Sequence, residues 1–302
     1  MSQPAYTWKH ADMQRNLVDR VPPHAYFVVS AVFHYLGPAF AALLFGHIDV
    51  LGVAWLRIVG AGAFFAVWRR PWRFTRALSP GQLFDLLGLG VVLAVMNACF
   101  YLAIDRLPLG TVGAIEFLGP VCLAALGARG RRNGAALILA VAGVYLLADV
   151  RFAGEPLGFA FAFANAALFV AYVVLGHRIA EGGGGGGGVD LLAAAMLVAS
   201  MVITPMGLAG ALPALGAPLL VAAGVGVGLC SSVIPYVADQ MAMARLPRAT
   251  FALLLSILPA TATIIGVLVL GQIPTVIEVI GVLLVVGAVA MHESEANVAS
   301  KA

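Results

Sequence analysis

Long runs of apolar residues, separated by short segments with charged residues, glycine or proline, constrain this chain more than any other feature. Ten runs are close to the roughly 20 residues that an α-helix needs to cross a bilayer. They lie at 24–45, 50–68, 82–104, 108–127, 133–149, 156–177, 190–210, 217–243, 248–270 and 275–291. Apolar and polar residues do not alternate within them, which excludes the pattern of a transmembrane β-barrel. The sequence therefore predicts an all-α integral membrane protein with ten transmembrane helices.

The composition limits the function classes in the same direction. Hydrophobic residues make up 62% of the 302 residues and charged residues make up 10%, against about 25% charged residues in ordinary soluble domains. Because so little charge cannot cover the surface of a soluble fold, the composition excludes a soluble enzyme, a nucleic-acid binder and a disordered protein. The expected surroundings are a lipid bilayer.

The distribution of Lys and Arg predicts the orientation, since cytoplasmic loops carry an excess of these residues. With a cytoplasmic N-terminus and ten helices, fourteen Lys and Arg residues fall in inner segments, and only Arg106 and Arg151 fall in outer ones. We therefore expect both tails, 1–23 and 292–302, in the cytoplasm. The seven glycines Gly182–Gly188 then lie in an inner loop, where a flexible linker or a hinge is expected.

Two parts of the chain resemble each other at a constant offset of 139 positions. Six residues match between 103–120 and 242–259: Ala103, Arg106, Leu107, Pro108, Thr111 and Pro120 correspond to Ala242, Arg245, Leu246, Pro247, Thr250 and Pro259. The shared Arg-Leu-Pro lies outside in the first part and inside in the second. This pattern predicts two inverted five-helix repeats, at 24–149 and 156–291. Such repeats place a substrate site near the midplane of the membrane and allow alternating access.

Several motifs make the chain resemble a known family. They are Ala114-Ile-Glu-Phe-Leu-Gly-Pro120, Gly143-Val-Tyr-Leu-Leu147, Gly281-Val-Leu-Leu284 and the run from Phe100 to Gly110. With the ten-helix layout, they resemble the EamA family of the drug/metabolite transporter superfamily, and in particular its bacterial amino-acid exporter branch. The resemblance covers 24–291. Ala128 and Gln272 are departures, because many members carry Glu there.

The resemblance implies a transporter of the bacterial inner membrane that exports amino acids or related metabolites by alternating access. The implied partners are a small-molecule substrate and the lipid bilayer, and we expect a monomer. No catalytic motif and no spacing of metal ligands occurs in the sequence. We therefore expect no enzymatic activity, no cofactor and no metal, and an intramembrane enzyme is the least favoured alternative.

Glu116 is the most informative residue inside the predicted helices. It lies eight residues after Pro108, about 12 Å from the outer surface at 1.5 Å per residue, and an isolated carboxylate there would be costly. It either contacts a substrate ammonium or a coupling proton, or forms a structural ion pair with Arg57, which lies eight residues after Asp49. Because a carboxylate alone would also serve a cation, an exporter of multiple cationic drugs remains the alternative.

Other polar and aromatic residues share helix faces and are candidates for the wall of a cavity. Asn97 and Tyr101 are four apart, and Ser232, Tyr236 and Gln240 form a stripe with the same spacing. The complete set of candidate substrate-binding residues is His34, Tyr35, Asn97, Tyr101, Glu116, Asn165, Tyr172, Ser232, Tyr236 and Gln240. Interhelical hydrogen bonding is the competing explanation. Pro38, Pro120 and Pro259 are predicted kinks, either hinges or static bends.

Overall fold

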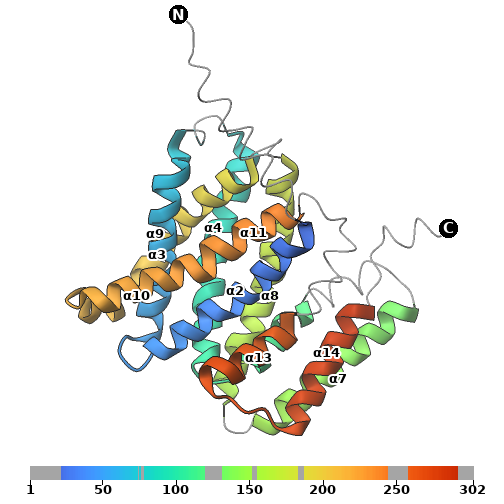
Figure 1. Ribbon diagram of the computed structural model, residues 1–302. Coiled ribbons are helices and arrows are strands. Elements are labelled where there is room, and N and C mark those ends of the chain that lie inside the picture. The colour runs from blue at the N-terminus through green and yellow to red at the C-terminus, as the bar shows by residue number, and fades with distance from the viewer. Residues whose placement is uncertain are drawn as a thin grey trace, which may run out of the picture.

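The computed structural model describes residues 22–73, 75, 78–119, 131–151, 155–182, 187–243 and 258–291, and the regular elements in these ranges are all helical (Figure 1). They are α2 (Pro23–Leu44), α3 (Val50–Arg69), the 3₁₀ turn η1 (Pro71–Arg73), α4 (Pro80–Ile104), α5 (Leu109–Glu116), α7 (Arg131–Arg151), α8 (Pro156–Gly182), α9 (Gly187–Leu215), α10 (Pro218–Gly228), the π-helix η4 (Leu229–Val233), α11 (Ile234–Met243), α13 (Leu258–Leu270) and α14 (Val276–Met291). The predicted all-α class is confirmed for this part of the chain.

The described helices have the length and surface of membrane spans. Six are long and apolar enough to cross a bilayer: His24–Leu44, Val50–Arg69, Pro80–Ile104, Pro156–Gly176, Gly188–Leu215 and Pro218–Asp239. Three shorter apolar helices lie at Gly134–Leu147, Leu258–Leu270 and Val276–Ala288. Large hydrophobic side chains such as Phe84, Met201 and Leu268 are more than two-thirds exposed, which suits lipid contact and not water. The chain is therefore a multi-pass membrane protein.

Each of the ten predicted ranges overlaps a described helix, but residues 120–127 and 248–257 lie outside the described ranges. The count of ten spans therefore stays a prediction.

The positions at which the helices start follow from local chemistry. Proline occupies the first position of α4 and α10, where its missing N–H costs nothing. Ser79 and Gln82 form a capping box at α4, and Asp49 accepts from two backbone N–H groups at the start of α3.

Three helix pairs run antiparallel along each other: α3 with α9, α5 with α13, and α7 with α14. In the first pair, Trp55 donates to Thr204 near one end and Arg69 meets Asp190 at the other. In the third pair, Gly143 and Gly281 face each other so closely that a Cβ on Gly143 would lie 2.6 Å from the Gly281 carbonyl oxygen. Figure 1 shows α7 and α14 side by side at the lower right.

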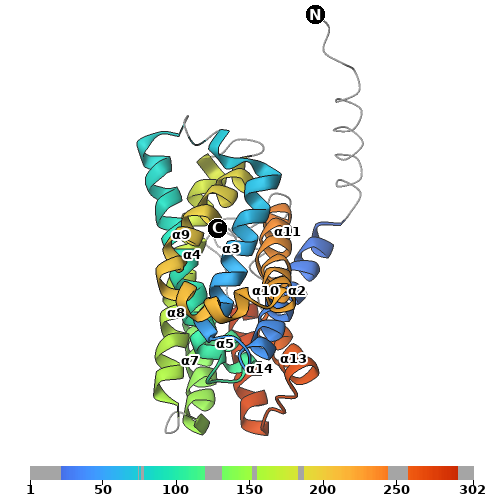
Figure 2. The ribbon, with the colours of Figure 1, turned by 90° about the vertical axis from the view of Figure 1, so that its left-hand side faces the viewer.

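Four further helix contacts also connect the two predicted repeats. α4 packs along α8 and against α9, whereas α11 and η4 pack along α2, and α10 packs against α3. Seen from the side, the axes of most long helices are roughly aligned with one another (Figure 2). The core between them is formed by buried side chains such as Phe65, Leu93 and Met196.

The π-helix η4 interrupts the continuous helix α10–α11 where two other helices come close. A Cβ on Gly37 of α2 would overlap the Ser231 Cβ, and a Cβ on Gly228 would overlap the Arg57 carbonyl oxygen. Glycine at both positions therefore lets α2 and α3 approach η4 at backbone distance. Single π-turns inside α-helices frequently occur at functional sites, and this one lies beside the buried polar residues described below.

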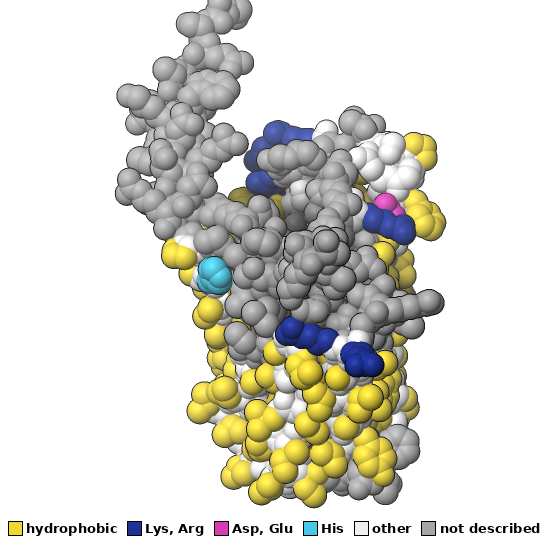
Figure 3. Space-filling view, turned by 90° about the vertical axis from the view of Figure 1, so that its right-hand side faces the viewer, with side chains coloured by type: hydrophobic (Ala, Val, Ile, Leu, Met, Phe, Trp, Pro, Cys, Tyr) yellow, Lys and Arg dark blue, Asp and Glu magenta, His cyan; other side chains and the backbone are white. Residues whose placement is uncertain are grey.

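Basic side chains gather at one end of the molecule. The C-terminus of α3 with Arg69, the N-terminus of α7 with Arg132 and the C-terminus of α8 with Arg178 belong to this end. Figure 3 shows basic side chains at the top and again near the middle of one face, with a mostly hydrophobic surface below them. At the opposite end, one arginine lies close to the helix termini among the described side chains, namely Arg106.

Candidate functional site

Several polar and charged side chains are buried within the helix bundle. The described buried residues of this kind are Ser30, Arg57, Asn97, Thr111, Glu116, Asn165, Ser231, Ser232 and Glu278. Buried polar groups are costly unless hydrogen-bonded. Five of the nine were predicted candidates: Arg57, Asn97, Glu116, Asn165 and Ser232.

Glu116 is the centre of the first polar cluster. It is the last residue of α5 and is 2% exposed. The Tyr35 hydroxyl of α2 donates to Glu116 Oε2 at 3.2 Å, and Asn165 Nδ2 of α8 donates to Oε1 at 3.1 Å. His34 Nε2 lies 3.9 Å from Oε2. Three helices that are distant in sequence thus bring three other predicted residues around the Glu116 carboxylate.

Arg57 is the centre of the second cluster and is 4% exposed. Its Nε donates to the Ser232 hydroxyl at 3.0 Å, and its Nη2 donates to the Ser231 carbonyl oxygen at 2.9 Å, both in η4. The guanidinium lies over the Tyr101 ring, 5.2 Å from its centre, a distance suited to a cation–π contact. Neutral groups therefore hold this cation.

The predicted ion pair between Arg57 and Glu116 is not formed in the described part of the chain. Arg57 turns to the serines of η4, and Glu116 turns to Tyr35 and Asn165. The equal depth of Arg57 and Glu116 along their helices suggested a pair. In the structure the guanidinium points to η4 instead, and the backbones of α3 and this helix come close at Gly228.

Aromatic side chains lie between the two clusters. The rings of Tyr172 and Tyr236 are 5.8 Å apart, and Tyr172 continues to Phe169 and then to Phe117. The charges of Arg57 and Glu116 both act on the hydroxyl of Tyr236, so this residue lies near both clusters. The predicted aromatic candidates Tyr172 and Tyr236 are thus brought together with the charged residues.

The other predicted residues have various positions. Asn97 donates to the Leu93 carbonyl oxygen one turn earlier in α4. Gln240 lies in α11, but its side chain is outside the described atoms. Pro38 is inside α2 and Pro259 is in α13. Pro120 lies outside the described residues.

Two polar groups close to the clusters were not predicted as part of the site. The Ser231 carbonyl oxygen orients Arg57, and no sequence pattern reveals which carbonyl a π-turn presents. Asp239, which is not among the predicted candidates, interacts with Ser30 and His34. Its spacing of seven residues from Ser232 gave a weak signal, since seven residues are two helical turns.

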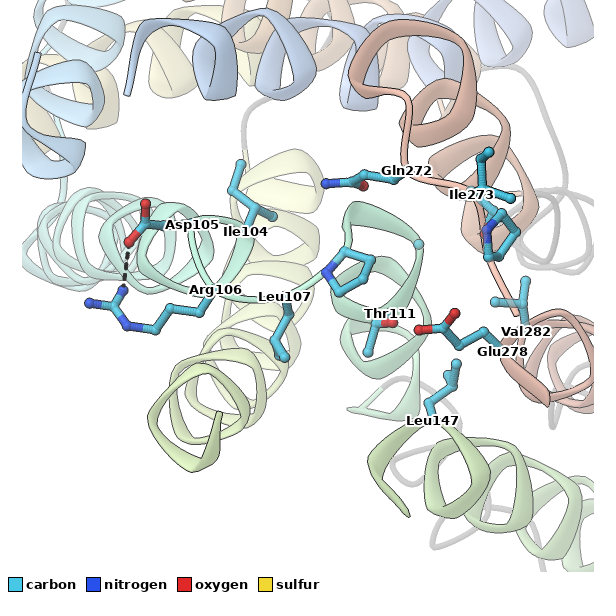
Figure 4. Close-up of a pocket in the computed structure, with 14 residues that line it drawn as sticks. Ile104, Asp105, Arg106, Leu107, Thr111, Leu147, Gln272, Ile273, Glu278 and Val282 are labelled. Carbon is cyan, nitrogen blue, oxygen red and sulfur yellow. Dashed lines mark ion pairs between the residues drawn. The ribbon is translucent and has the colours of Figure 1, made fainter. Parts of the chain in front are cut away.

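An open pocket of about 280 Å³ lies at one end of the bundle, where α4 leads into α5 and α13 leads into α14 (Figure 4). Gln272 Oε1 accepts a hydrogen bond from the Leu109 backbone N–H at 3.0 Å. Gln272, at a position where many members of the resembled family carry Glu, therefore supplies a hydrogen-bond acceptor for the start of α5. In Figure 4, Glu278 and Thr111 point toward one another. The lining includes neither Arg57 nor Glu116.

The described residues contain no group of three His, Cys, Asp or Glu side chains that could hold a metal ion. Cys99 and Cys230 are free thiols. Within the described ranges, the chemistry of the site therefore consists of charge, hydrogen bonds and aromatic surface.

Comparison with known proteins gives close relatives over most of the chain. The threonine/homoserine exporter RhtA of Escherichia coli (strain K12) is 31% identical over 250 residues, which are 81% of this chain and 82% of that protein. The exporter of the same name from Salmonella typhimurium (strain LT2) is 30% identical over 258 residues, 83% of this chain and 84% of the relative.

A crystal structure with 19% identity covers 89% of this chain and 96% of its own, with a TM-score of 0.60, and it shows a shared fold. No family model matches the chain. The identity and coverage of the relatives confirm the predicted resemblance. The chain belongs to the family of the threonine/homoserine exporters, within the drug/metabolite transporter superfamily.

Proposed function

We propose that this protein exports small polar amino acids across the bacterial inner membrane. The observation that carries the proposal is a carboxylate, Glu116, buried among Tyr35, Asn165 and His34. A carboxylate with hydrogen-bonding neighbours suits a primary ammonium group. Threonine and homoserine, named as substrates of the relatives, are the first amino acids to test.

Ten transmembrane helices in two inverted repeats form the scaffold of this proposal. A two-fold axis in the plane of the membrane reverses the direction of each helix, so equivalent helices that touch must be antiparallel. The pairs α3 and α9, α5 and α13, and α7 and α14 meet this requirement. It also requires that the packing of α4 on α8 recur as α11 on α2, and that of α4 on α9 recur as α10 on α3. These recurrences support the inverted repeat, and alternating access then follows from rocking of the halves.

The basic end of the bundle faces the cytoplasm in this proposal. Arg69, Arg132 and Arg178 lie at that end, as the positive-inside rule requires. Substrate enters from there, occupies the site between α2, α5 and α8, and leaves at the end where Leu109 and Gln272 meet.

Purified protein in liposomes loaded with labelled threonine, homoserine, other amino acids and one cationic dye tests the proposal. We expect saturable efflux of threonine or homoserine and none of the dye. Saturable dye efflux without efflux of any amino acid would overturn the proposal and favour the cationic-drug exporter. Empty liposomes and protein inactivated by heat serve as controls.

A further inference from the structure

We propose that Arg57 binds the carboxylate of the substrate while Glu116 binds its ammonium group, so that the site selects zwitterions. The substrate itself then completes the electrostatic link that the two residues do not make directly. This inference rests on the proposed function and deepens it, because it assigns the residue that distinguishes an amino acid from a simple cation.

The first argument is the missing charge neutralisation. Arg57 is 4% exposed and Glu116 is 2% exposed, yet the hydrogen bonds of each go to neutral groups. A charge buried without an opposite charge carries a large desolvation penalty. A ligand that brings a positive group to Glu116 and a negative group to Arg57 offsets both penalties at once.

His34 does not remove this imbalance. Its Nε2 lies 3.9 Å from Glu116 Oε2, which is beyond hydrogen-bond distance. Asp239 is a second carboxylate that His34 acts on electrostatically. A single imidazole, even when protonated, carries one positive charge and cannot neutralise two carboxylates. Arg57 has no corresponding anionic neighbour within ion-pair distance among the described residues.

The second argument is the orientation of the guanidinium. Hydrogen bonds from Nε and Nη2 to Ser232 and Ser231 occupy one edge of the group, and the Tyr101 ring covers one face. The hydrogen bonds of the guanidinium to described residues come from Nε and Nη2, and the neutral Tyr101 hydroxyl also lies beside the group. The remaining Nη1–Nη2 edge is a planar pair of donors, the geometry with which Arg binds a carboxylate. The rotamer is thus fixed before a ligand arrives.

The third argument is the position of Tyr236. Arg57 and Glu116 both act electrostatically on its hydroxyl, as does Asp239, so both charges lie within electrostatic reach of this one residue. The ammonium and carboxylate of an amino acid are attached to one carbon atom. We expect a ligand with two opposite charges beside Tyr236 to meet both Arg57 and Glu116, which a molecule with a single charge cannot do.

Transport of three related solutes by proteoliposomes tests the assignment. They are threonine, threoninol, which lacks the carboxylate, and 2,3-dihydroxybutanoate, which has a hydroxyl in place of the ammonium. We expect the unmodified protein to transport threonine at least tenfold better than either analogue. Arg57→Gln should lose tenfold to hundredfold in threonine transport, a range consistent with a lost charged hydrogen bond, and should leave threoninol transport unchanged or increased.

Two further variants keep the test independent of folding. Arg57→Lys preserves the positive charge and should retain part of the threonine transport. Arg178→Gln removes an arginine whose side chain is 62% exposed at the inner end, and it should leave the preference among the three solutes unchanged. Each variant is first compared with the unmodified protein by size-exclusion elution.

The outcomes separate the inference from the proposed function. If Arg57→Gln and Arg57→Lys reduce threonine and threoninol transport by the same factor, Arg57 is structural and the inference is wrong. Equal transport of threonine and threoninol by the unmodified protein also overturns it, while amino-acid export stands. If the unmodified protein transports no amino acid, the proposed function fails and the inference fails with it.

Discussion

At the scale of single residues, the site depends on how charge is held inside a bilayer. Glu116 keeps its carboxylate in apolar surroundings because Tyr35 and Asn165 donate to its two oxygens. Asn165 Oδ1 and the Tyr101 hydroxyl are buried without a hydrogen-bond partner in the described residues. Such unsatisfied groups are uncommon in folded proteins, and here both lie next to the charged residues that we assign to substrate binding.

Glu116→Gln should reduce the apparent affinity for threonine by about tenfold or more, since a hydrogen bond to a charged group contributes about 1.5–3 kcal/mol. The amide can still accept from Tyr35, so the melting temperature should change little. Concentration-dependent efflux and thermal unfolding in detergent measure the two effects. Glu155→Gln, at the partly exposed start of α8, is the matched control. A large loss of thermal stability with normal transport by the remaining folded protein would assign Glu116 to folding alone.

At the scale of helices, small residues decide which elements meet. α7 and α14 approach at Gly143 and Gly281, and α2 meets η4 at Gly37. In lipid, helices gain little from burial of apolar surface and depend on close van der Waals packing. The glycines therefore set the distances that place Arg57, Tyr35 and Glu116 in one region.

Gly143→Ala should destabilise the contact between α7 and α14 by about 1–3 kcal/mol, because the new Cβ would lie 2.6 Å from the Gly281 carbonyl oxygen and overpacking has this cost. Gly134→Ala in the same helix has nothing within 4 Å and should be neutral or stabilising by about 0.5–1 kcal/mol. The fraction of protein that survives heating in detergent reports both. Equal thermal stability of the two variants would mean that α7 and α14 do not pack at Gly143.

At the scale of the whole molecule, charge and packing point to the same arrangement. The described helix ends with Arg69, Arg132 and Arg178 lie at one end of the bundle. The recurring helix pairs are the ones that a two-fold axis between the two proposed repeats would relate. An inverted pair of this kind has two related conformations, one open to each side.

The topology predicts a pattern of chemical labelling. In a background without Cys99, Cys122 and Cys230, single cysteines at positions 153 and 216 should react with a membrane-impermeant maleimide added to intact cells. Cysteines at positions 75 and 184 should react only after the membrane is permeabilised. The charge asymmetry is the physical reason. The reverse pattern at any two of these positions would show that the span count is wrong.

Alternating access predicts two distances at the outer end. Spin labels at Gly46, after α2, and at Ile273, between α13 and α14, lie in different repeats, and both positions are exposed. In a membrane we expect two populations whose ratio shifts with threonine, provided that threonine binds the two conformations with different affinity. Pulsed electron paramagnetic resonance measures them. One narrow distance that no transported solute changes would favour a fixed pore.

The sequence by itself determined the helices, because continuous apolar runs of this length leave hardly any alternative to a helix in lipid. The ranges predicted for α3 and α4 differ from the observed helices by at most two residues at either end. The sequence also indicated His34, Tyr35, Glu116 and Asn165 as polar residues that need partners, because burying them in lipid without partners is costly. Their grouping around one carboxylate agrees with that expectation.

Only the tertiary structure decided the partners of Arg57. Counting residues from a helix end gives the depth of a side chain in the membrane, and by depth Arg57 and Glu116 were equivalent. The direction of a side chain around the helix axis depends on which neighbour packs closest. That choice was made by Gly228 and the π-turn at Ser231 and Ser232, whose carbonyl and hydroxyl hold the guanidinium away from Glu116 and leave the two charges separate.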